Sequence, residues 1–229
     1  LIKNYLPAMN KSEIFLVMVS GMGTIAGTVM ATYIGMLSGG DPVARVLFAK
    51  HLISASLMAA PGSIVLAKML CPQTEEATDH VAISGKEKEN SNILDAISSG
   101  TVTGVKLMTN IAAMLLVFIS LVALANYITE GVIGRYTGLN DWIVKITDGK
   151  AQGLTFQFIL GVITSPFMWL IGVPSQDIML VGSLLGQKTI LNEFVAYFQL
   201  QQWKDAGLFM YEKSILMSTY ILCGFANIS

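Results

Sequence analysis

The sequence is poor in charge. Charged residues make up only 13% of its 229 residues, where soluble domains carry roughly 25%, and its mean hydropathy is +0.62. A water-soluble domain is therefore excluded as a class. Long apolar runs stand in place of the missing charges, and they predict a polytopic membrane protein whose surroundings are a lipid bilayer.

Further absences narrow the function. The formal net charge is −1 and the Lys and Arg residues are scattered, so the clustered cations that bind phosphate backbones are missing and nucleic acid is not an expected partner. Cys71 and Cys223 stand far apart without a metal-binding set, and we expect both to be buried, inert thiols. The sequence has no serine-protease-like or zinc-protease motif, so we expect no catalytic residues, no cofactor and no enzyme activity.

The two ends of the sequence also lack familiar signals. Residues 1–6 have neither the basic start nor the apolar core of a signal peptide, and the chain does not begin with Met. Residues 214–229 form an apolar segment without a polar flank. We expect the chain to be an internal piece of a longer protein.

Apolar segments divide the chain. Segment 13–37 is long enough to cross a hydrocarbon core of about 30 Å. Its Gly23 and Gly27 form a GxxxG pair, and hydroxyl residues recur every fourth position, so we expect close helix packing along one face. Segment 93–134 predicts a helix that is tilted or extends beyond the bilayer. Residues 72–92 predict an aqueous loop.

Three positions predict helix ends or breaks. Pro61 lies inside the apolar segment 43–70, where a proline kinks or breaks a helix. Ser175 is a candidate N-cap for the helix that follows, with Asp177 in its first turn. Gly186 lies in the middle of the last long apolar segment, where we expect a helix to end and the chain to reverse.

Lys188, Asn192 and Glu193 interrupt that last segment with polar groups. An ionised side chain at the centre of a bilayer costs at least about 2.5 to 3.5 kcal/mol, so such residues usually line a bundle interior or a watery cavity. Glu193 is therefore a candidate binding residue near the tip of a re-entrant hairpin. Two alternatives remain open: a buried Glu193–Lys188 ion pair of purely structural value, and a channel or intramembrane enzyme that uses this pair.

The motif GQKTILNEFVAY (186–197), with LIGVP (170–174) before it and CGFAN (223–227) after it, resembles the concentrative nucleoside transporter family. The N-terminal stretch through TIAGTVMATYIG and the stretch FAKHLISASLMAAPGSIVLAKMLCPQTE resemble the same family, so the resemblance covers essentially the whole chain. It implies an all-α transporter fold with inverted repeats, broken helices and re-entrant helical hairpins, assembled as a homotrimer in a bacterial inner membrane.

The resemblance also implies a division of the chain and a mechanism. The expected parts are transport-domain helices (1–71), a polar loop (72–92), a long scaffold helix (93–134), a connection (135–153), the second re-entrant hairpin region (154–203) and the start of a broken helix (204–229). The implied function is secondary active uptake of nucleosides by alternating access, driven by a sodium or proton gradient.

Site residues follow from the family's motifs. Glu193 is expected to accept hydrogen bonds from the ribose hydroxyls, and Asn227 to bind the same ribose. Phe225 is expected to line the pocket and Val29 to pack on the nucleobase. The hydroxyl of Thr24 and the main-chain carbonyl of Ile25 are expected to hold the coupling sodium. The hairpin that would read the nucleobase would precede Leu1, so the choice between purine and pyrimidine stays open.

Overall fold

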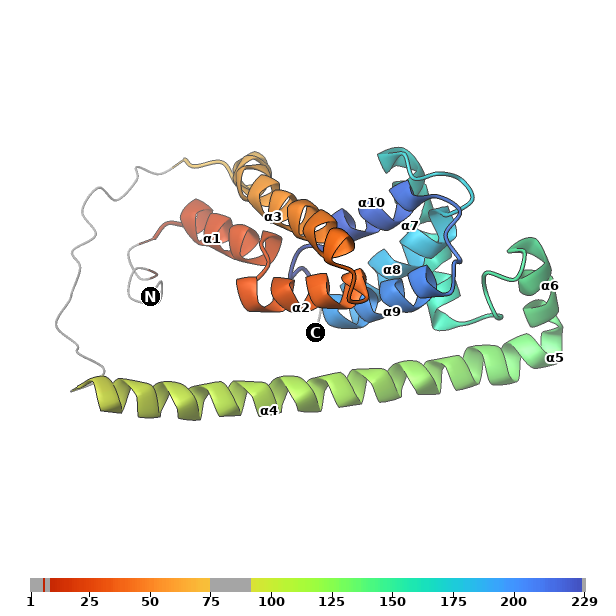
Figure 1. Ribbon diagram of the computed structural model, residues 1–229, viewed down its shortest axis with the longest axis horizontal. Coiled ribbons are helices and arrows are strands. Elements are labelled where there is room, and N and C mark those ends of the chain that lie inside the picture. Colours follow the sequence, from red (N-terminus) through yellow and green to blue (C-terminus); the bar gives the residue numbers. More distant parts are fainter. Residues whose placement is uncertain (1–5, 7–8, 75–91, 228–229) are drawn as a thin grey trace.

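The computed structural model describes residue 6 and residues 9–74 and 92–227, and within these ranges the chain is helical and contains no strand (Figure 1). The all-α expectation is confirmed. In chain order the elements are α1 (Lys11–Gly23), α2 (Gly27–Ser38), α3 (Pro42–Leu70), α4 (Ile93–Asn126), the π-helical segment η3 (Tyr127–Gly134), α5 (Arg135–Thr137), α6 (Leu139–Ile146), α7 (Phe156–Ile171), α8 (Ile178–Ile190), α9 (Glu193–Asp205) and α10 (Glu212–Leu222).

Three helical stretches are long and apolar enough to cross a membrane: Lys11–Ser38, Pro42–Leu70 and Ile93–Thr137. The last has 45 residues. At 1.5 Å per residue it is about 68 Å long, roughly twice the hydrocarbon thickness, as expected for a helix that tilts or extends beyond the bilayer. Figure 1 shows α4 running along one side of the other helices. Most of the predicted polar loop lies outside the described residues.

The first apolar segment is two helices rather than one. α1 ends at Gly23, residues 24–26 are not helical, and Thr24 and Ala26 are extended. The prediction of a continuous small-residue face is therefore wrong, because Gly23 and Gly27 belong to different helices. Only Gly23 makes a close contact, since a Cβ there would lie 3.6 Å from the Ser63 Cβ of α3.

α3 stays helical through Pro61, so the predicted break does not occur. In a membrane helix the groups freed by a proline can be satisfied by side-chain hydroxyls and neighbouring helices. The carbonyl that Pro61 leaves without its helical donor is that of Leu57, four residues earlier. Ser63, two residues on, donates a hydrogen bond of 2.7 Å to a different carbonyl, that of Ala60. Ser63 and Ala59 of this part of α3 face Gly23 of α1.

α7 and α8 form an antiparallel hairpin whose turn lies at residues 172–177, and glycines allow the close approach. A Cβ at Gly182 would lie 2.7 Å from the Thr164 Oγ1, and one at Gly186 would lie 2.4 Å from the Leu160 Cβ. Gly186 thus serves packing inside α8. The prediction that the helix ends and reverses there is wrong, because α8 continues to Ile190.

The turn of this hairpin is anchored by Asp177, which is fully buried. Its carboxylate accepts hydrogen bonds from the Met210 and Tyr211 N–H groups at 3.0 and 3.1 Å and pairs with Lys150 at 3.3 Å. Ser175 is not the expected N-cap, because α8 begins at Ile178 and the Ser175 hydroxyl donates to Gln176 instead. Asp177 therefore ties the turn to the α9–α10 connection.

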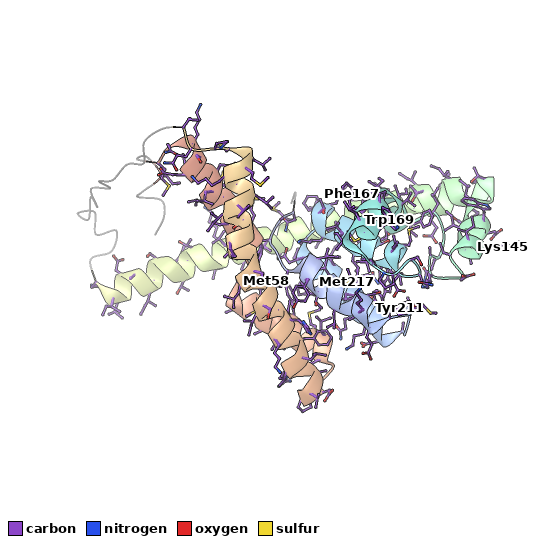
Figure 2. The ribbon with its side chains drawn as sticks, turned by 90° about the horizontal axis from the view of Figure 1, so that it is seen from above. Met58, Lys145, Phe167, Trp169, Tyr211 and Met217 are labelled. Carbon is purple, nitrogen blue, oxygen red and sulfur yellow. The ribbon has the colours of Figure 1, made fainter. Side chains whose placement is uncertain are left out.

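The core lies where α2, α3, α8, α9 and α10 meet. Its members are buried side chains from all five helices: Tyr33, Leu37, Phe48, Leu52, Ala55, Leu184, Ala196, Tyr197, Leu200, Leu222 and Cys223. Cys223 is buried as predicted, whereas Cys71 is only half-buried. Away from this core the helices expose apolar side chains, such as Phe167 and Trp169 of α7, which are labelled in Figure 2.

Replacing Gly186 by Ala is expected to destabilise the complete protein by about 1–3 kcal/mol, because the new Cβ meets the α7 side chain of Leu160. The thermal unfolding midpoint in detergent measures this. Gly100→Ala on α4 is the matched control, since no heavy atom lies within 4 Å of its Cβ position. Equal midpoints for the two variants would contradict the packing role.

Asp177→Ala is expected to destabilise the protein by about 1–3 kcal/mol, because the Met210 and Tyr211 N–H groups lose the buried carboxylate that accepts from them. Ser175→Ala, two residues away, removes an exposed hydroxyl and should leave the unfolding midpoint unchanged. Limited proteolysis of the 206–211 connection provides a second measurement. A stable Asp177→Ala variant with an uncut connection would refute the anchor.

Candidate functional site

Glu193 begins α9, directly after the short break that ends α8. The break has a local cause: Asn192 is extended, and its side-chain oxygen accepts a hydrogen bond of 3.0 Å from the Val195 N–H, which caps α9. A carboxylate in the first turn of a helix is favoured by the helix dipole. Glu193 is only 5% exposed, so its charge is held inside the helix bundle. Glu193 follows the two-residue break between α8 and α9, two helices that contact each other, and its place near the tip of a re-entrant hairpin stays a prediction.

The Glu193 carboxylate has partners from two distant parts of the chain. The Asn227 side-chain amide donates to Oε2 at 3.1 Å. The Tyr33 hydroxyl of α2 donates to Oε1 over a long 3.5 Å. The structure therefore brings together Glu193 and Asn227, two of the predicted site residues, and adds Tyr33.

Tyr33 is held firmly in place. Its ring stacks on that of Tyr197, one turn beyond Glu193, with 4.1 Å between centroids. The Tyr197 hydroxyl in turn donates a 2.8 Å hydrogen bond to the Thr219 carbonyl of α10. α2, α9 and α10 are thus joined by one aromatic and hydrogen-bonded column beside the carboxylate.

The C-terminal ends of α1 and α10 lie against each other. α1 ends at Gly23, and α10 ends at Leu222 before the non-helical residues 223–227. A Cβ at Gly224 would lie 3.3 Å from the carbonyl oxygens of Met22 and Gly23, so only a glycine fits this crossing without a shift. The crossing places the first break next to the segment that carries Asn227.

The first break offers oxygen ligands. Thr24 and Ile25 lie in the non-helical residues between α1 and α2, and the Thr24 hydroxyl donates to the Ser20 carbonyl at 3.3 Å. Carbonyl and hydroxyl oxygens are the ligands that hard alkali cations prefer, and helix ends with unwound backbone supply them in transporters. The described residues contain no group of three or more His, Cys, Asp or Glu side chains that could hold another kind of metal.

Val29, expected to pack on the nucleobase, and Phe225, expected to line the pocket, lie on α2 and in the segment that follows α10. Val29 is half-buried in the first turn of α2 and packs against the core cluster. Phe225 lies in the unwound segment two residues before Asn227 and is 36% exposed. The structure therefore places both on elements of the site, with Phe225 at its open side.

Lys188 does not form the ion pair that was left open for Glu193. Its ammonium donates a 2.9 Å hydrogen bond to the Ile221 carbonyl in the last turn of α10. Within the described ranges the ion pair that does form is the one between Lys150 and Asp177. The alternative of a structural Glu193–Lys188 ion pair is therefore replaced by separate contacts. Lys188 bonds the Ile221 carbonyl, and Glu193 accepts from Asn227 and Tyr33.

Tyr33 and Gly224 are site residues that the sequence did not reveal. A tyrosine in an apolar helix is usually an ordinary core or interface residue, and nothing within 13–37 points to an acid 160 positions later.

A cavity of about 400 Å³ lies elsewhere, among residues of η3, α7, α8, α9 and the loop before α7. None of the predicted site residues lines it, so it does not bear on Glu193.

Residues 51–229 match the family model described as Na+ dependent nucleoside transporter C-terminus. An uncharacterized transporter of Haemophilus influenzae is 37% identical over 231 residues, which cover 100% of this chain and 50% of the relative. Nucleoside permease NupC of Helicobacter pylori is 36% identical over 230 residues, covering 100% and 49%. The chain thus spans about half the length of the curated relatives it matches.

A solved structure of CNTnw in an inward-facing substrate-bound state is similar in fold, with a TM-score of 0.77 and 36% identity. The match covers 99% of this chain and 48% of that one. A CNTnw variant in an outward-facing state gives a TM-score of 0.79 at 35% identity. The relatives and structures match essentially the whole chain, and the family model matches residues 51–229. The chain is an integral membrane protein that belongs to the family of Na+ dependent nucleoside transporters, not to an enzyme family.

Proposed function

We propose that the protein of which this chain is a part is a sodium-coupled nucleoside symporter that works by alternating access. The observation that carries the proposal is the buried Glu193 carboxylate, held by Asn227 where two broken helices meet. NupC of Helicobacter pylori is a nucleoside permease, and CNTnw has both inward-facing and outward-facing states. These relatives support a mechanism in which the binding site opens alternately to the two sides of the membrane.

In this proposal Glu193 recognises the ribose. A carboxylate can accept from two adjacent hydroxyls, and the Asn227 amide can donate and accept in one contact. In the structure the two donors on Glu193 are Tyr33 and Asn227. The ribose hydroxyls would take over these acceptor positions, so binding exchanges one set of hydrogen bonds for another rather than leaving a bare buried charge.

In this proposal the nucleobase and the sodium ion bind beside the Glu193 carboxylate. Val29 and Phe225 supply the apolar and aromatic walls that suit the faces of a nucleobase. Thr24 and Ile25 would hold sodium at the first helix break, and the description of the matching family favours sodium over the proton. No covalent chemistry is required.

The remaining expectations belong to the same proposal. The parts 1–71, 154–203 and 204–229 would move as the transport domain, with the second re-entrant hairpin within 154–203, against the scaffold helix 93–134. A homotrimer in a bacterial inner membrane is the proposed assembly. A channel or intramembrane enzyme built on Glu193 and Lys188 is not favoured, because Lys188 bonds the Ile221 carbonyl instead.

Glu193→Gln in the complete protein is expected to leave folding intact and to abolish nucleoside uptake, because the amide offers one acceptor oxygen where the ribose needs two. Uptake of labelled uridine and adenosine into proteoliposomes under an imposed sodium gradient measures this, with the unfolding midpoint as the folding control. Unchanged uptake would sink the proposal. A variant that fails to fold would instead assign Glu193 a structural role.

Tyr33→Phe removes a donor to Glu193 but keeps the ring that stacks on Tyr197. We expect the KM for nucleoside to change about two- to tenfold, since one long hydrogen bond of 3.5 Å contributes roughly 0.5–1.5 kcal/mol. Phe194→Leu, which disturbs a tilted ring contact 6.4 Å from Tyr33, is the control for packing alone. The same KM in wild type and Tyr33→Phe would show that Tyr33 acts only as a core residue.

A further inference from the structure

The uncharged part of α4 ends beside a group of polar side chains. Residues 107–125 carry no charge and, at 1.5 Å per residue, measure about 28 Å, close to the thickness of a hydrocarbon core. Asn126 follows them directly, and Glu130 lies one turn further on in η3. The exposed rings of Tyr127 and Trp142 also come after this boundary, and such rings gather at the headgroup level of a membrane. Glu130 is therefore expected at headgroup depth.

The cavity of about 400 Å³ opens at the same level. The long helix contributes Asn126 and Glu130 to its wall, the loop before α7 contributes Lys150, and α9 contributes Gln199 and Trp203. Its volume lies within the range of pockets that hold small ligands, roughly 300–1,000 Å³. Charged and amide groups stand beside apolar and aromatic ones, so the wall suits a ligand that has both charge and apolar surface.

The two charged groups of the wall have bonding capacity to spare. The Glu130 carboxylate makes no hydrogen bond or ion pair with a described residue, and only its main-chain carbonyl is bonded, by Asn140. The Lys150 ammonium donates to the Gln176 carbonyl at 2.6 Å and to the Asp177 carboxylate at 3.3 Å, which leaves one of its three N–H groups. The cavity thus offers an acceptor to a cation and a donor to an anion.

The surroundings of the cavity are apolar. Next to its lining residues, Tyr127 and Ile128 of η3 and Phe198 of α9 expose their side chains. In a bilayer such side chains contact acyl chains, because no water reaches them at that depth. A ligand with two charges in its head and apolar chains behind it therefore matches the cavity and its margin together.

We propose that this cavity binds the headgroup of an aminophospholipid, of which phosphatidylethanolamine is the simplest. The lipid ammonium donates to the Glu130 carboxylate, and the lipid phosphate accepts from the free N–H of Lys150. The headgroup then links the long helix to α8 and α9, whose residues Met179 and Gln199 lie on the far wall. Binding depends on the membrane location of the protein and not on the solute that it carries.

The test is native mass spectrometry of the purified complete protein in detergent, with equal amounts of phosphatidylethanolamine, phosphatidylcholine and phosphatidylglycerol that carry the same acyl chains. The choline ammonium has no N–H, and the glycerol headgroup has no ammonium. We expect wild type to retain phosphatidylethanolamine about fivefold more than either, the effect of one favourable charge contact near a membrane surface. Equal retention of the three lipids would overturn the proposal without any variant.

Glu130→Gln keeps the shape of the side chain and removes its charge, so we expect it to abolish the preference over phosphatidylcholine. Glu130→Lys places two cations in the wall and should shift the preference to phosphatidylglycerol. Asp141→Asn is the matched control, since this exposed carboxylate of α6 does not line the cavity. The unfolding midpoint without added lipid checks the folding of each variant. A folded Glu130→Gln protein with the wild-type preference would refute the site.

A soluble compound with the same head is the remaining alternative occupant. Glycerophosphoethanolamine has the ammonium and the phosphate but no acyl chains, so it should not displace phosphatidylethanolamine at equal concentration. Displacement at equal concentration would show that the acyl chains add nothing, and the lipid proposal would then fail. Because these measurements record binding alone, their outcome is separate from that of the uptake experiments.

Discussion

Backbone groups that leave a helix inside a membrane must find partners in the protein, because hydrocarbon offers none. Both breaks described here meet this constraint, by different means. The α10 end takes a donor from Lys188, and the α1 end lies against Gly224 with its Thr24 hydroxyl turned back onto the Ser20 carbonyl. The positions of the other site residues depend on where these two helix ends come into contact.

The packing of the hairpin determines where Glu193 lies. Glycines at 161, 182 and 186 draw α7 and α8 together, and Asp177 fixes their turn to the connection before α10. α8 is thereby placed against α10, which brings Lys188 to Ile221 and the start of α9 to Asn227. A buried carboxylate is tolerated at this point because donors from two other elements reach it.

Sequence reasoning recovered the helical class and the polar interruption, because charged residues are rare in an apolar run. The family motifs named Glu193 and Asn227 as ribose-binding residues, and the structure shows these two side chains in contact. It failed where packing overrides local propensity. Pro61 lies inside α3 without ending that helix. Gly186 is a packing contact inside α8 rather than the end of a helix. The N-cap residue of α8 is Asp177 rather than Ser175. Tyr33 could not be found, since its role depends on a contact 160 residues away.

The central claim is that nucleoside and cation bind at one junction of two breaks, which requires their affinities to be linked. Two ligands that share a site's conformation raise each other's affinity by the same factor. The most direct measurement is calorimetric binding of uridine and adenosine to the purified complete protein with sodium and with an equal concentration of choline. The account predicts clearly tighter nucleoside binding in sodium, whereas equal affinities in the two salts would contradict it.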